Sequence, residues 1–114
     1  MSEIIGIARQ RIHEGKLDEF KRQAAECMRL AREKGTGTLQ YDFYFNADES
    51  ECIVLERYRD SAALLEHFQN LGDVATAIMK ICTTTGEVLG EPSPELAQAL
   101  ASYGVPVFKP FMRR

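Results

Sequence analysis

Apolar and polar residues alternate with two different periods along the chain. Residues 16–34 place apolar side chains along one continuous face at helical spacing, which predicts an amphipathic helix. Residues 39–46 and 51–59 alternate between apolar and polar positions, which is the period of a strand. Only the short polar segment 47–50 separates these two strands. The pattern therefore predicts an antiparallel hairpin that follows a long helix.

The segments on either side extend this order. Residues 3–13 are rich in isoleucine and predict a first strand. Asp60 is a favourable N-cap for a helix that ends near Leu71. The spacing of its apolar residues predicts a buried stripe of Leu64, Phe68 and Leu71. A helix therefore follows the hairpin.

The last third of the chain predicts four more elements. Residues 74–81 indicate a short helix and residues 83–89 a strand, in which Gly86 marks a bulge or a close approach. A Ser-Pro-Glu start opens a helix over residues 93–102. Residues 105–111 are extended, but two prolines restrict them to an edge strand or a packed tail.

The predicted order is β-α-β-β-α-β, followed by a helix and a tail. It is the order of the α+β ferredoxin-like split βαβ fold, in a single domain over residues 1–114. The core spans about 3–90, and the additional helix and tail span about 92–114. The helices cover one face of the sheet, while the other face is still partly apolar. We expect a second copy of the chain to cover it, which makes the protein a homodimer.

Composition and charge argue against several classes of partner and site. The net charge is −3 and the basic residues are dispersed, which argues against nucleic acid as a partner. No apolar run approaches the ~20 residues that cross a bilayer, and no signal peptide is visible, so we expect a cytoplasmic protein without membrane contact. Cys27, Cys52 and Cys82 are widely spaced and predict buried thiols rather than a metal site.

Two stretches are similar to a known family. The run from Glu56 through Tyr58 and Asp60 to His67 resembles the E-x-W-x-D-x-x-A-(x)n-H run of the antibiotic biosynthesis monooxygenase family. Residues 37–41 resemble the glycine-to-tyrosine start of that family's second strand, and the similarity covers about residues 3–90. The tail 103–110 is similar to the end of a subset of these proteins.

The resemblance implies a dimeric α+β barrel in which two ferredoxin-like sheets face each other. The resemblance indicates the fold more specifically than the reaction, because relatives include quinol oxygenases, haem-degrading enzymes, lactone isomerases and proteins without a known reaction. This chain has Tyr58 at a position where the family often has Trp. The haem-degrading branch uses an Asn on its first strand, whereas this chain has no Asn before Asn46, which argues against haem degradation.

Glu56 and His67 are the candidate catalytic residues. Glu56 shares a strand face with Val54 and Tyr58, and a carboxylate in such an apolar setting gains a raised pKa suited to proton transfer. The alternative is a structural carboxylate that pairs with an Arg or a helix start. His67 lies at the border of the predicted helical stripe, where it could act as a base or equally be a satisfied core residue.

Aromatic residues near these positions are candidates for binding a flat ring. They either line a pocket or simply fill the core. The candidates are Tyr41, Phe43, Phe45, Tyr58 and Phe68.

The leading hypothesis is a monooxygenase that needs no cofactor and acts on a small aromatic molecule, such as a quinol. An electron-rich quinol can supply the electrons for O₂ itself, while the protein removes a proton, holds the ring and excludes water. His67 or Glu56 is the expected base, and Tyr58 and Tyr41 are expected to orient the ring. The alternatives are a non-catalytic ligand-binding or stress-related dimer, and a lyase or isomerase on the same barrel.

Overall fold

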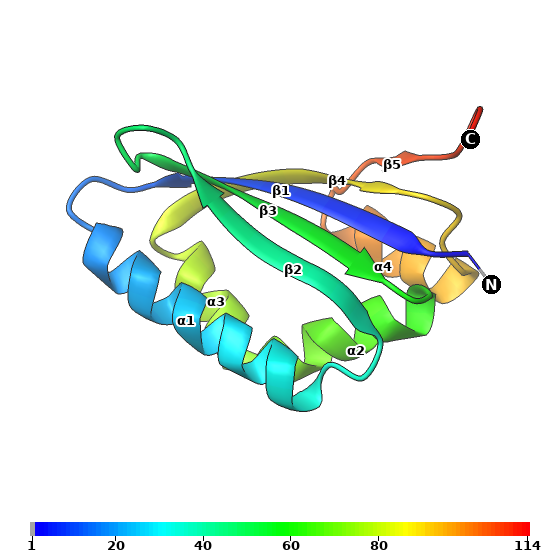
Figure 1. Ribbon diagram of the computed structural model, residues 1–114, viewed down its shortest axis with the longest axis horizontal. Helices are drawn as coiled ribbons and strands as arrows, with labels where there is room; N and C mark the ends of the chain where they lie inside the picture. The colour runs from blue at the N-terminus through cyan, green and yellow to red at the C-terminus, as the bar shows by residue number, and fades with distance from the viewer. Residues whose placement is uncertain (1) are drawn as a thin grey trace.

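The computed structural model describes residues 2–114, and its elements follow the predicted order (Figure 1). All predicted boundaries are close to the observed ones except in the tail, where the strand is only two residues long. The elements are β1 (Ile4–Ile12), α1 (Leu17–Lys34), β2 (Thr38–Phe45), β3 (Glu51–Tyr58), α2 (Ser61–Leu71), α3 (Asp73–Met79), β4 (Cys82–Leu89), α4 (Pro94–Ser102) and β5 (Val107–Phe108).

The strands form one sheet in the order β2-β3-β1-β4-β5. The pairs among β1 to β4 are antiparallel, and β5 runs parallel to β4. The helices lie on one face of the sheet, as expected for the ferredoxin-like fold (Figure 1). Because β2 is the first strand in this order, it lies at an edge of the sheet, and α1 and α2 contact it.

Local sequence signals fix the helix ends. The Asp60 side chain accepts a hydrogen bond from the Ala63 amide at 2.9 Å, which confirms the predicted cap of α2. At the start of α4, the Ser93 hydroxyl accepts from the Leu96 amide at 3.2 Å, and Pro94 occupies the first turn. These bonds satisfy amide groups that have no partner within the helix.

The core consists of two apolar clusters. The first contains α4 and the adjoining end of the sheet, and we name it the α4 cluster: Ile4, Tyr58, Ala63, Leu64, Val88, Leu96 and Leu100. The second lies under α1 and α3, and we name it the α1 cluster: Phe20, Cys27, Cys52, Val54, Ile78, Ile81 and Cys82. The three cysteines are buried and free, as predicted.

The predicted stripe of α2 is wrong in one position. The helix buries Ala63, Leu64 and His67, while Phe68 is 39% exposed. A β-carbon on Gly37 would lie only 2.4 Å from the Ala63 β-carbon, so this pair of small residues lets the helix and the β2 start approach closely. That contact turns the Ala63 and His67 side of α2 inward and moves Phe68 toward solvent.

The prediction for Gly86 is confirmed, whereas the predicted alternation of β2 fails at one residue. Gly86 marks a close approach: a β-carbon there would lie 2.7 Å from the Ile7 carbonyl oxygen, while the β1–β4 register stays regular. In β2 the register shifts between Thr38 and Gln40, so Leu39 leaves the expected alternation and is exposed.

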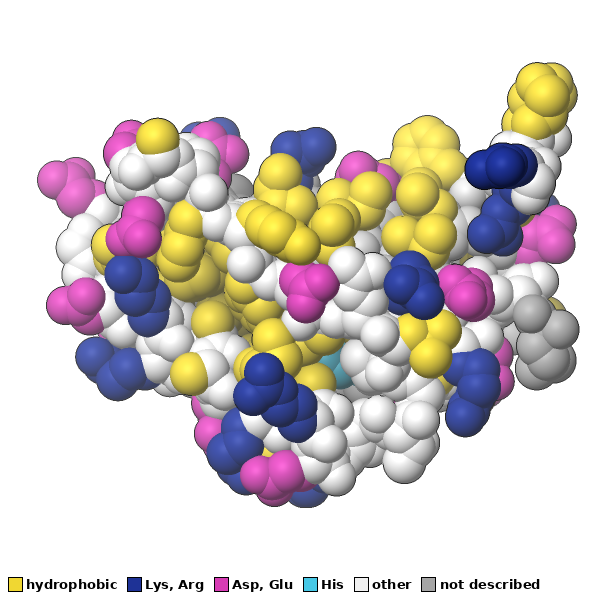
Figure 2. Space-filling view, in the orientation of Figure 1, with side chains coloured by type: hydrophobic (Ala, Val, Ile, Leu, Met, Phe, Trp, Pro, Cys, Tyr) yellow, Lys and Arg dark blue, Asp and Glu magenta, His cyan; other side chains and the backbone are white. Residues whose placement is uncertain are grey.

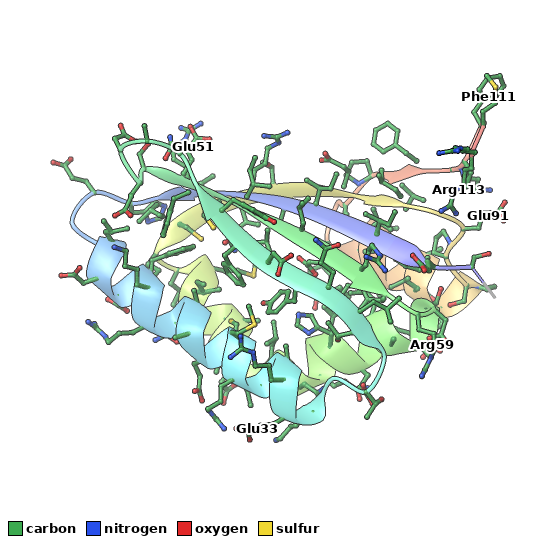
Figure 3. All side chains as sticks on the ribbon, in the orientation of Figure 1. Glu33, Glu51, Arg59, Glu91, Phe111 and Arg113 are labelled. Carbon is green, nitrogen blue, oxygen red and sulfur yellow. The ribbon has the colours of Figure 1, made fainter. Side chains whose placement is uncertain are left out.

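The face opposite the helices is not covered by any element of residues 2–114 (Figure 1). Hydrophobic side chains gather along it, above the sheet in Figure 2. They include Ile5, Ile7, Ile53, Leu55, Tyr44 and Leu89. The C-terminal tail also leaves the domain, and Phe111 projects from it (Figure 3). Within residues 2–114, no helix has the length and apolar character required to traverse a membrane.

Candidate functional site

Glu56 and Tyr58 meet on the helix-facing side of β3. They are two residues apart, so both side chains point to the same face. The Tyr58 hydroxyl donates a hydrogen bond to Glu56 Oε1 at 2.5 Å. Glu56 lies directly opposite Gly6 on β1, where a β-carbon would come within 3.6–3.7 Å of Glu56 atoms. These separations are ordinary van der Waals contacts, so Gly6 and the Glu56 side chain pack against each other on the inner face of the sheet.

Burial governs the protonation of this pair. Glu56 keeps a small accessible surface but is densely surrounded by protein, and this desolvation raises the pKa of its carboxyl group. The hydrogen bond from Tyr58 acts in the opposite direction and limits the rise. Burial and the Glu56 charge also raise the pKa of Tyr58, so its hydroxyl stays a donor at neutral pH. The pair is a buried carboxyl group with a fixed hydrogen-bond donor.

His67 lies beside this pair and is more deeply buried than its predicted border position. Its side chain is 2% exposed, and its ring centroid lies 5.4 Å from that of Tyr58 and 4.8 Å from that of Tyr41. Burial lowers the pKa of His67 to about 4, so the imidazole is neutral at neutral pH. Its Nδ1 atom is buried without a hydrogen-bond partner. Buried polar atoms without a hydrogen-bond partner are rare in folded proteins, so His67 is a candidate for a role other than packing.

Tyr41 links this pair and His67 to the surface. Its side chain lies on the helix-facing side of β2, and its ring makes an edge contact with Phe43, with centroids 5.1 Å apart. Burial and the nearby Cys27 and Glu56 raise the pKa of the Tyr41 hydroxyl. The Cys27 thiol in turn has a pKa raised to about 11, again mainly by burial. Both groups are therefore protonated at neutral pH.

An open groove runs between the second half of α1 and the edge strand β2. We name it the α1–β2 groove; it has a volume of about 300 Å³. Figure 2 shows a hollow between the sheet and the helices with hydrophobic side chains on its floor. The lining residues are Met28, Ala31, Arg32, Gly35, Thr38, Leu39, Gln40, Tyr41 and Asp42. Tyr41 is thus the residue that the groove shares with the buried group.

The structure brings together five of the predicted site residues and leaves two apart. Those that meet are the catalytic candidates and three of the aromatic ones: Glu56, Tyr58, His67, Tyr41 and Phe43. Phe45 lies at the far end of β2, where it packs against Phe20 with ring centroids 6.0 Å apart. Phe68 is on the solvent side of α2.

Sequence reasoning missed Cys27 and Arg32. Cys27 and Arg32 lie on α1, and only the three-dimensional packing places them beside β2. Over residues 2–114, no three His, Cys, Asp or Glu side chains lie together in a way that could hold a metal ion.

The architecture defines an α+β domain of the ferredoxin-like type that carries acid–base and aromatic groups between its sheet and its helices. The family described as "Antibiotic biosynthesis monooxygenase" matches residues 4–78, which is more than half of the chain. The chain belongs to this family, as its resemblance predicted. None of the curated proteins compared with the sequence matches it.

Solved structures share this fold. MupZ from Pseudomonas fluorescens has a TM-score of 0.87 at 23% identity, and the match covers 98% of this chain and 93% of MupZ. Rv0793 from Mycobacterium tuberculosis has a TM-score of 0.70 at 23% identity over 80% and 96% of the two chains. The N63A mutant of SnoaB, a cofactor-independent oxygenase from Streptomyces nogalater, has a TM-score of 0.68 at 17% identity over 80% and 94%. At these identities the similarity shows the fold alone.

Proposed function

We propose that the protein is a cofactor-independent monooxygenase that oxidises a small electron-rich aromatic molecule, such as a quinol, with O₂. The observation that carries this proposal is the partly buried Glu56–Tyr58 hydrogen bond beside a neutral His67 with an unpaired Nδ1. Family membership supports the reaction class, and the neighbour SnoaB is described as a cofactor-independent oxygenase. Perturbed titratable groups of this kind concentrate at functional sites.

The reaction balances without an external reductant. The base takes a proton from a hydroquinone hydroxyl, and the resulting anion transfers electrons to O₂. One oxygen atom then forms a bond to a ring carbon that loses its hydrogen, and the other leaves as water. A hydroquinone and O₂ thus give a hydroxyquinone and H₂O, since the ring loses the four electrons that O₂ accepts. The protein supplies the base, the orientation and the exclusion of water.

Either Glu56 or His67 can accept the proton, and the pH dependence of kcat/KM separates them. A base must be deprotonated in the free enzyme, so activity falls as the pH drops through its pKa. For His67 that loss lies near pH 4. For Glu56, whose pKa is raised by burial, it lies above the ordinary carboxyl range. Tyr58 and Tyr41 are the groups that orient the ring in either case.

Oxygen consumption with a panel of hydroquinones, in buffers freed of metal ions, tests the proposal. We expect turnover by the wild type and at least a hundredfold loss in a double variant with His67→Ala and Glu56→Gln. Phe68→Ala is the matched control on α2, because Phe68 lies on the solvent side of the same helix. Equal rates for wild type and double variant would remove these two residues from the mechanism.

One observation favours a second candidate, a ligand-binding protein without turnover. The α1–β2 groove reaches Tyr41 but is not lined by His67, Glu56 or Tyr58. This alternative predicts that aromatic ligands raise the melting temperature while no O₂ is consumed. Product formation without O₂ would indicate instead a lyase or isomerase, so each assay is also run anaerobically.

We also propose that the protein is a homodimer. The support is the outer sheet face, which carries Ile5, Ile7 and Leu55 and has no helix above it among residues 2–114. Analytical ultracentrifugation at micromolar concentration should detect a dimer, and Ile7→Glu should convert it to monomer. A stable wild-type monomer would contradict the proposal. The cytoplasmic location stays a prediction.

A further inference from the structure

We infer that the α1–β2 groove binds an aromatic substrate that carries a carboxylate, and that Arg32 recognises this anion. The inference rests on the proposed function of the same site and specifies its substrate class. It depends on the charges that line the groove and on which of them already have partners within the protein.

The two arginines near the end of α1 have different surroundings. Arg29 forms ion pairs with Glu26 at 2.6 Å and with Glu33 at 3.0 Å. Glu33 lies on the side of α1 away from the sheet (Figure 3). Arg32 instead lines the groove, and no acidic side chain of residues 2–114 lies within 4.0 Å of its guanidinium group. Its donors are therefore available to a ligand.

Asp42, the acidic residue in the lining, is already engaged. Its carboxylate accepts a hydrogen bond from Gln40 Nε2 at 2.9 Å. The Gln40 carbonyl oxygen in turn accepts from Arg57 at 3.2 Å, and Arg57 pairs with Glu3 at 3.3 Å. This chain of contacts links Asp42 to a cation outside the groove lining. Arg32 is consequently the groove charge without a partner.

The position of Arg32 relative to Tyr41 defines the shape of the ligand. Both residues line the groove, Arg32 from α1 and Tyr41 from β2, and Tyr41 contacts His67 in the interior. An aromatic acid can place its ring against Tyr41 and its carboxylate on the planar guanidinium group, which binds carboxylates through two parallel hydrogen bonds.

Binding of two redox-inert ligands tests this inference without any turnover. The probes are 2-naphthoate and the neutral 2-naphthalenemethanol, measured by titration calorimetry. We expect the wild type to bind the naphthoate about tenfold more tightly, and Arg32→Gln to remove this preference. Arg32→Lys should retain part of it, because a lysine keeps the charge but loses the bidentate geometry. Lys34→Gln is the matched control, since Lys34 is an exposed cation of α1 outside the groove lining.

The outcomes separate this inference from the proposed function. Equal affinity for the two probes, no binding of either, or equal losses in Arg32→Gln and Lys34→Gln would each overturn the role of Arg32. Turnover of hydroquinones by the wild type together with equal affinity for the two probes would keep the oxygenase and remove the carboxylate preference. Arg32-dependent binding of the naphthoate without any O₂ consumption would keep the anion site and reject the oxygenase.

Discussion

The two ends of the helix-covered layer differ in what they bury. The α4 cluster is filled mainly by aliphatic side chains such as Ile4, Leu96 and Leu100, all of which are almost completely buried. Beside β2, the protein instead buries a carboxyl group and a neutral imidazole. Burial of such groups destabilises the fold, because the interior solvates them less well than water. The contrast fits the proposed function, in which the α4 end stabilises the domain and the β2 end carries the candidate acid–base groups.

The largest expected effect is the loss of activity in Glu56→Gln. Glutamine can still accept the Tyr58 hydrogen bond, but it cannot take a proton. With Glu56 as the base, we expect kcat/KM for a hydroquinone to fall by about 100-fold to 10,000-fold. Glu51→Gln, an exposed residue at the start of the same strand, is the control. Activity of Glu56→Gln above half the wild-type value would show that the carboxyl group is structural.

The same variant has a predicted effect on stability. The pKa of Glu56 is raised in the folded state, so folding favours the protonated form, and stability is lost as the pH rises through that pKa. Glu56→Gln removes this loss. We therefore expect the variant to be at least as stable as the wild type at pH 8 in urea unfolding. A lower stability would mean that the ionised Glu56 is itself stabilising.

The second prediction tests the opposite end of the layer. Leu96 is completely buried in the α4 cluster, so Leu96→Ala should lower the free energy of unfolding by about 2–5 kcal/mol. Activity per folded molecule should change much less than stability at low temperature, since α4 does not line the groove and shares only Tyr58 of its cluster with the candidate site. Met79→Ala, at an exposed apolar position of α3, is the control and should have little effect. A loss of specific activity in Leu96→Ala would show that the two ends are coupled.

The third prediction concerns the pH dependence that His67 causes. Its pKa is lowered to about 4 in the folded state from 6.5, so below pH 6.5 the unfolded chain binds the proton more readily. The His67 contribution to stability thus decreases by about 2–3 kcal/mol between pH 7 and pH 4.5. Urea unfolding of His67→Leu at both pH values should lack this decrease relative to the wild type.

The difference in pH dependence between wild type and His67→Leu reports the His67 contribution alone, because Glu56 is present in both proteins. The contribution of Glu56 to the pH dependence has the opposite sign. His13→Gln is the control, since His13 is exposed at the end of β1. The same pH dependence in wild type and His67→Leu would mean that the imidazole is accessible to protons in the folded state. At pH 7, His67→Leu should not be less stable, because Nδ1 has no partner to lose.

The sequence was sufficient for the fold because each element carries its own periodicity and its own end signal. The Asp60 cap and the alternation of β3 are local features, and both are confirmed. Alternation also placed Glu56 and Tyr58 on one face, where they form a hydrogen bond. These predictions succeeded because they depend on neighbouring residues only.

The remaining features of the site depend on contacts between distant segments. The rotation of α2 follows from the Gly37–Ala63 contact, so the spacing of apolar residues alone placed Phe68 inside and His67 at the border. Alternation predicted the correct face of β2 for Phe45. It did not show that Phe45 lies too far along the strand from Tyr41 to join the candidate site. The groove arises where α1 lies beside an edge strand, and no local pattern specifies that arrangement.

The smallest expected effect concerns α2, which belongs to both regions. This helix contributes Leu64 to the α4 cluster and His67 to the candidate site. Asp60→Ala removes its cap and should lower the free energy of unfolding by about 1 kcal/mol, whereas Asp60→Asn should change it by only a few tenths. Asp73→Ala is the control, because Asp73 lies in the first turn of α3, which has no side-chain cap bond. Urea unfolding that finds equal losses in Asp60→Ala and Asp73→Ala would show that general helix-terminus electrostatics, rather than the Ala63 hydrogen bond, stabilises the start of α2.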